Sequence, residues 1–78
     1  MDTLFTSENC PGCRVLERLP EYAQALAAGR LRVANIDRDP GARDAFFAAG
    51  LGGVPTLLRL GAPPVVGAGP IARALRGF

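Results

Sequence analysis

The chain has 78 residues, of which 49% are hydrophobic and 21% charged, and its net charge is +2. This length and composition indicate one folded domain, residues 1–78, rather than a disordered segment. No apolar run approaches the roughly 20 residues that span a bilayer, and no signal peptide is recognisable, so we expect a cytoplasmic protein that does not bind membranes. Because the arginines are scattered, we expect no binding to nucleic acid. We also expect a monomer.

The first half of the chain predicts a strand, a helix and a second strand. Thr3–Thr6 has the length of a short strand, and Leu31–Ile36 is predicted to pair with it in parallel, because a helix connects the two. That helix is expected to end at Gly29. Its apolar stripe keeps its phase across Pro20, which favours one kinked helix over two. The stripe consists of Val15, Leu16, Leu19, Tyr22, Ala23 and Leu26.

The next helix is bounded by recognisable start and stop residues. Asp39 and Pro40 form a good N-cap and first-turn pair, which predicts a helix through Ala49. Gly50 is expected in the left-handed conformation, with Leu51 folding back onto the helix. The two heaviest core candidates of this helix are Phe46 and Phe47.

The last elements complete a βαβαββα order. Residues 56–60 predict a third strand, Val65–Val66 a short edge strand, and Pro70 the start of a final helix. That helix is expected to bury Ile71, Leu75 and Phe78. The predicted fold is α/β, a four-stranded mixed sheet with helices on both faces, since the second and third strands are apolar on both sides.

The only two cysteines lie in the segment Cys10-Pro11-Gly12-Cys13, where the first strand turns into a helix. In a reducing compartment such a close pair is more often catalytic or metal-binding than structural. With Cys10 as N-cap and Pro11 in the first helical position, the amides of Gly12 and Cys13 would point back toward the Cys10 sulfur. These donors would stabilise a thiolate, the form that attacks a disulfide.

The spacing assigns different roles to the two sulfurs. Cys10 is predicted to be the accessible nucleophile, and Cys13, one turn inside the helix, the resolving thiol. Gly12 leaves the approach to the sulfur open. Arg14 would favour the thiolate and Glu8 would oppose it, and the sequence alone does not rank the two.

Two other interpretations of the pair remain open. Two thiolates are half of a zinc or iron–sulfur ligand set, so a metal or cluster would require a second chain or an external thiol. Alternatively, the cysteines are inert core residues of an interaction module. The chain contains no histidine, which removes the usual zinc ligand, and no resident metal or tightly bound cofactor is expected.

The chain resembles the glutaredoxin and thioredoxin superfamily, specifically its small glutaredoxin-like members, over nearly its whole length. The resemblance rests on the cysteine motif, the order of elements and the segment Gly53-Val54-Pro55-Thr56 before the third strand. It implies a thioredoxin-like fold, a cis peptide bond at Pro55, and a position for Pro55 against the cysteine pair. It further implies that the backbone of Val54 contacts an incoming peptide or thiol.

The same resemblance suggests what the redox pair acts on. Glutaredoxins hold glutathione near a glycine pair before the last helix, and Gly67-Ala68-Gly69-Pro70 is similar to that turn, although it lacks the accompanying acid. Glutathione is therefore a candidate co-substrate, with Pro11, Gly12, Gly67 and Ala68 near it. The expected function is a thiol–disulfide oxidoreductase that reduces protein or mixed disulfides, with a reductase or glutathione as electron donor.

Overall fold

The computed structural model describes residues 1–77 and consists of four strands and four helices. The strands are β1 (Asp2–Thr6), β2 (Leu31–Asn35), β3 (Thr56–Leu58) and β4 (Val65–Val66). The helices are α1 (Pro11–Glu17), α2 (Pro20–Ala27), α3 (Pro40–Ala48) and α4 (Ala68–Arg76).

The four strands form one mixed sheet in the order β2-β1-β3-β4. β1 pairs with β2 in parallel and with β3 in antiparallel orientation, and β3 pairs with β4 in antiparallel orientation. The predicted α/β class, the mixed sheet and the parallel first pair are confirmed. Since β1 is central, the chain leaves the middle of the sheet at Thr6 and enters the cysteine segment directly above it.

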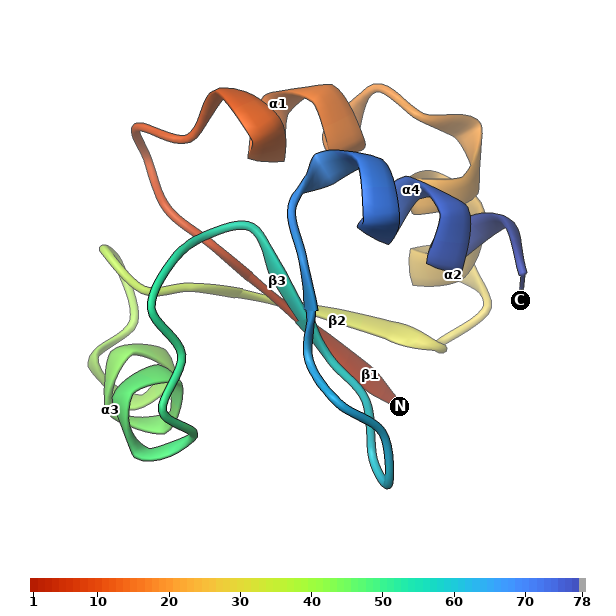
Figure 1. Cartoon of the computed structure of the whole chain (residues 1–78). Coiled ribbons are helices and arrows are strands. Elements are labelled where there is room, and N and C mark those ends of the chain that lie inside the picture. The colour runs from red at the N-terminus through yellow and green to blue at the C-terminus, as the bar shows by residue number, and fades with distance from the viewer. Residues whose placement is uncertain (78) are drawn as a thin grey trace.

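Helices cover both faces of the sheet, as predicted (Figure 1). α1, α2 and α4 gather on one face, and α3 lies alone on the other. Because successive strand residues point to opposite faces, Leu4 and Phe5 belong to different cores. The core on the three-helix side consists of Leu4, Leu16, Ala25, Leu31, Leu57, Ile71 and Leu75. The core under α3 consists of Phe5, Ala34, Ala42 and Phe46.

The prediction of one kinked helix across Pro20 is wrong. α1 ends at Glu17, and Leu19 has an extended backbone (φ −76°, ψ 138°) as the N-cap of a separate helix that Pro20 opens. Since the residue before a proline disfavours helical ψ, the chain breaks here, and the predicted stripe loses its phase. Val15, Ala23 and Leu26 are consequently exposed, whereas Ala25, outside the predicted stripe, is fully buried.

α3 begins at Pro40 as predicted and ends at Ala48, one residue before the predicted end, and only one of its two predicted core phenylalanines is buried. Asp39 caps the first turn, Gly50 has a φ of 72°, and the Leu51 amide donates to the Phe46 carbonyl at 3.2 Å. Phe46 is buried, whereas Phe47 is 60% exposed. Neighbouring helical residues are about 100° apart around the axis, so only one of them can face the sheet.

The C-terminal elements differ from the prediction at their ends. β3 stops at Leu58, and Leu60 is 99% exposed. α4 begins at Ala68 rather than at Pro70, and Gly67, with a φ of 96°, is its N-cap. Pro70 fits into the first turn because backbone N–H groups there have no partner within the helix, so the missing N–H of proline costs no hydrogen bond. Ile71 and Leu75 are buried as predicted, while Phe78 lies outside the described residues.

Among the helices described, none has the length and apolarity to cross a membrane.

Candidate redox site

The start of α1 places the two sulfurs next to each other. Cys10 is the N-cap, with an extended backbone (φ −137°, ψ 93°), and Pro11 opens the helix. The Cys13 amide donates to the Cys10 sulfur at 3.1 Å. The sequence predicted that the amides of both Gly12 and Cys13 point to this sulfur. Among the described residues, only the Cys13 amide forms a hydrogen bond with it. The predicted cap geometry is therefore confirmed, with one sulfur-directed donor instead of two.

Cys10 and Cys13 are joined by a disulfide with an S–S distance of 2.10 Å and a Cα–Cα distance of 5.2 Å. Cys13 is completely buried, as the predicted role of a shielded second thiol requires. Cys10 keeps only 4% of its surface exposed, less than the sequence-based picture of an open nucleophile suggests. Its sulfur is turned inward because it is bonded to the buried Cys13 sulfur.

The segment before β3 packs directly against the cysteine motif. The peptide bond between Val54 and Pro55 is cis, as the family resemblance implied. A Cβ added to Gly12 would lie 3.1 Å from Cδ of Pro55 and 3.5 Å from Cβ of Ala68. Gly12 is thus needed for close packing, rather than for an open approach to sulfur. Three segments far apart in the sequence meet at this one glycine.

The backbone around Pro55 joins the start of α4 and leaves one residue unpaired. The Gly67 amide donates to the Pro55 carbonyl at 3.1 Å, which ties the turn before α4 to the cis-proline segment. Val54 is half-buried and packs against the core under α3. Within residues 1–77, its backbone N–H and C=O form no hydrogen bond. Val54 therefore presents a free donor and a free acceptor beside the cysteine motif.

The charges near the motif are engaged with partners. The Arg14 guanidinium donates to the Ser7 carbonyl at 3.2 Å and pairs with the Glu17 carboxylate at 3.2 Å. The Glu8 carboxylate accepts from Nε of Arg38 at 2.5 Å and from Nδ2 of Asn35 at 3.1 Å. The hydrogen bond from Arg38, followed by that from Asn35, lowers the pKa of Glu8 below its ordinary value.

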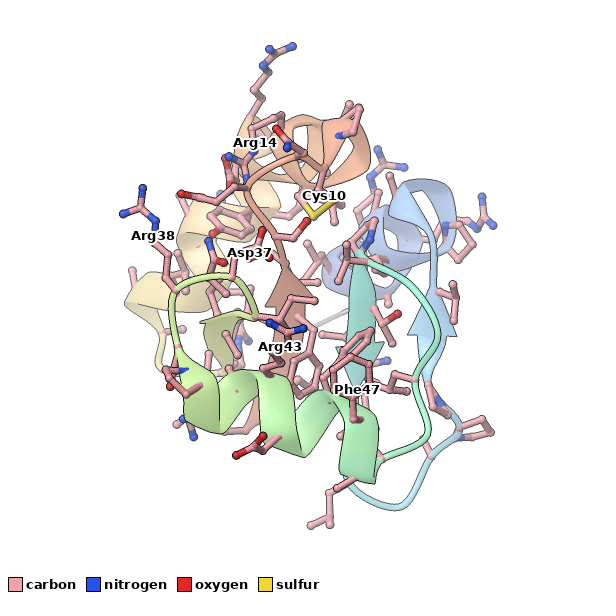
Figure 2. All side chains as sticks on the ribbon, turned by 90° about the vertical axis from the view of Figure 1, so that its left-hand side faces the viewer. Cys10, Arg14, Asp37, Arg38, Arg43 and Phe47 are labelled. Carbon is pink, nitrogen blue, oxygen red and sulfur yellow. A yellow bond between two sulfur atoms is a disulfide. The ribbon has the colours of Figure 1, made fainter. Side chains whose placement is uncertain are left out.

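Sequence reasoning missed the residues that hold Glu8. Asn35 is the last residue of β2, and Asp37 and Arg38 follow it; Figure 2 shows Asp37 and Arg38 on the side of the molecule that carries Cys10. Asp37 accepts from the Glu8 amide at 2.8 Å. The available signal was the parallel pairing of β1 and β2, since parallel strands end at the same edge of a sheet.

Two hollows in the surface lie away from the cysteine segment. They have volumes of about 250 and 350 Å³ and lie beside Met1, at the start of β1, whereas the cysteine segment follows its end. In the part of the chain that is described, no three Cys, Asp or Glu side chains converge as a metal site would require. Comparison of the chain with known family models and with curated proteins returned no match.

Proposed function

We propose that this protein is a small thiol–disulfide oxidoreductase of the thioredoxin-like, glutaredoxin-type fold, with Cys10 as nucleophile and Cys13 as resolving thiol. The observation that carries the proposal is the disulfide at the start of α1, capped by the Cys13 amide and packed against a cis-proline. A purely structural cross-link does not require this amide, this proline or the unpaired backbone of Val54.

The reaction begins with the reduced pair. The Cys10 thiolate attacks one sulfur of a substrate disulfide, whose S–S bond breaks, and the leaving substrate thiolate takes up a proton. The Cys13 thiol then loses its proton and attacks the Cys10 sulfur in the mixed disulfide. The second substrate thiol leaves, and the Cys10–Cys13 disulfide forms. Two electrons pass to the substrate, and an external dithiol, or two thiols, restores the reduced pair.

Burial supports the order of attack. Cys13 exposes none of its surface and Cys10 exposes 4%, so an external sulfur reaches the disulfide only through Cys10. The Cys13 amide that donates to the Cys10 sulfur would stabilise the thiolate that is released when the disulfide is reduced. A single donor serves both the oxidised and the reduced state, since it belongs to the backbone of α1.

The substrates proposed are extended segments of proteins that carry the target disulfide. The free N–H and C=O of Val54 would form strand-like hydrogen bonds with such a segment. Glutathione remains the candidate co-substrate, with its carboxylate at the first turn of α4, where Gly67 and Ala68 adjoin Pro55 and Gly12.

A trapping experiment tests the proposal. Cys13→Ser should accumulate a mixed disulfide on Cys10 when mixed with an oxidised protein substrate, and Cys10→Ser, the matched control, should accumulate none. A binding module would give no adduct with either variant. An iron–sulfur carrier would instead purify anaerobically as a coloured dimer. Parallel turnover assays with glutathione plus its reductase, and with thioredoxin reductase, would then identify the electron donor.

A further inference from the structure

The loop Ser7–Asn9, which leads from β1 to Cys10, is held from two sides. On one side, Arg14 donates to the Ser7 carbonyl at 3.2 Å. On the other side, residues at and after the end of β2 bind both the backbone and the side chain of Glu8: Asp37 accepts from its amide, and Asn35 and Arg38 donate to its carboxylate. The loop that sets the position of Cys10 is therefore fixed by residues more than 25 positions away.

Glu8 is the acid closest to Cys10 in the sequence. A carboxylate near a thiol disfavours the thiolate, because like charges repel. In this structure both carboxylate oxygens are engaged: Oε1 accepts from Nε of Arg38, and Oε2 accepts from Nδ2 of Asn35. These bonds turn the carboxylate toward β2 and cancel its charge with a cation that is itself 75% exposed.

We propose that Arg38 is a positioning residue for the redox pair: it holds and neutralises Glu8, so that the Cys10 thiolate does not face an uncompensated carboxylate. The inference rests on the proposed function, since only a reacting thiol benefits from this arrangement. Figure 2 shows Arg38, Asp37, Arg14 and Cys10 at one end of the molecule, above α3 with Arg43 and Phe47.

Other charged groups border the cysteine segment and would remain in place when Arg38 is changed. On α1, Arg14 and Glu17 form an ion pair. After β2, Asp37 is committed to the Glu8 amide. On α4, Arg73 lies near Gly69, one turn from the contact of Ala68 with Gly12. The segment of Val54 and Pro55 carries no charge. Substitution of Glu8 or Arg38 therefore changes the charge balance of that pair in one direction or the other, while the Arg14–Glu17 ion pair stays in place.

The experiment is a double-mutant cycle read by ultraviolet absorbance of the thiolate in reduced protein. All variants carry Cys13→Ser, so that only Cys10 titrates. Arg38→Gln should raise the midpoint of the titration by about half a pH unit, the size expected for one charge at the protein surface. Glu8→Gln should lower the midpoint, because it leaves Arg38 as an unpaired cation. The double variant should return close to the starting value, and high salt should shrink both single shifts.

The matched control is Arg32→Gln, which removes the same charge from an exposed position near the start of β2, opposite Thr3 of β1, and should leave the midpoint unchanged. An Arg38→Gln titration that coincides with the parent overturns the inference. So does a double variant that stays as far shifted as Arg38→Gln alone. Because the titration requires no substrate, its outcome is independent of the trapping experiment: a cycle that behaves as expected with no trapped adduct would contradict the proposed function and leave the charge pairing intact.

Discussion

Two helices of this protein start in nearly the same way, yet only one start forms part of the candidate site. Cys10 caps α1 with φ −137° and ψ 93°, and Asp39 caps α3 with φ −117° and ψ 107°. A proline follows each cap, and a glycine follows each proline. The Cys13 amide donates to the sulfur of Cys10 at 3.1 Å, and the Gly41 amide to the carboxylate of Asp39 at 2.9 Å.

The difference lies in what surrounds each start. Asp39 and its helix start are exposed to solvent, and the capping carboxylate stabilises the helix without any partner from elsewhere in the chain. Cys10 is buried, its cap atom is bonded to Cys13, and Pro55 and Ala68 pack against its glycine. The same local arrangement thus caps an exposed helix at α3, whereas at α1 tertiary contacts enclose it around the disulfide on which the proposed function rests.

Among substitutions that distinguish the two helix starts, the largest expected effect is the loss of turnover when Cys10 is replaced. Cys10→Ser keeps an N-cap of a favoured type, so the fold should survive, while disulfide-reduction turnover should fall by about 10³-fold or more because the nucleophile is lost. The corresponding change at the other helix, Asp39→Ser, should leave turnover unaltered. Equal turnover by the Cys10→Ser variant and the parent would contradict the assignment of the nucleophile.

The two glycines provide the next comparison. Gly12→Ala brings a Cβ to 3.1 Å from the ring of Pro55, whereas the nearest atom to a Cβ at Gly41 is the Asp39 carboxylate oxygen at 3.3 Å. The ring is rigid and the carboxylate can move. Gly12→Ala should therefore destabilise the protein by about 1–3 kcal/mol and slow turnover.

Gly41→Ala is the control for that substitution. It should be neutral or slightly stabilising, by up to about 1 kcal/mol, because alanine loses less backbone entropy in a helix than glycine. Urea unfolding of both oxidised variants measures the difference. If Gly12→Ala proved as stable as Gly41→Ala, the packing of the cis-proline segment on the motif would not matter energetically.

Removal of the carboxylate cap of α3 should have a smaller effect. Asp39→Ala should lower the free energy of unfolding by about 1 kcal/mol, since the Gly41 amide loses its acceptor. Turnover of the folded variant should match that of the parent. Asp39→Asn, which retains an acceptor, should recover most of the stability in thermal or urea unfolding. A loss of turnover in Asp39→Ala would mean that the two helix starts are coupled.

The smallest effect expected is a pH dependence from Glu8. Hydrogen bonds from Arg38 and then Asn35 lower its pKa in the folded protein below the ordinary value of 4.5. Its contribution to stability is therefore present above about pH 4.5 and is lost as the pH falls through the lower folded value. Unfolding curves should show a stability deficit for Glu8→Gln at pH 7 that shrinks progressively as the pH is lowered below 4.5. A deficit that does not change between pH 7 and the acid limit of folding would exclude the ionised carboxylate as its source.

The amino-acid sequence by itself determined the local features. These are the cap and first-turn prolines of α1 and α3, the left-handed glycine that ends α3, the two cysteines that form the disulfide, and the alternation of strands and helices. Each depends on a few neighbouring residues whose backbone preferences act over short distances. The α/β mixed sheet followed from the order of these elements. The break at Leu19 was missed because apolar periodicity was given more weight than the conformational restriction that Pro20 imposes.

Only the tertiary structure decided which residues meet at the cysteines. The contact of Gly12 with Pro55 and Ala68, the unpaired backbone of Val54 and the hydrogen bond from Arg38 to Glu8 join segments from four parts of the chain. The outward position of Phe47 was decided in the same way, by the rotation of α3 on the sheet. Such contacts depend on how strands pair and helices pack, and because many residue types satisfy the same local pattern, the pattern does not specify its distant partners.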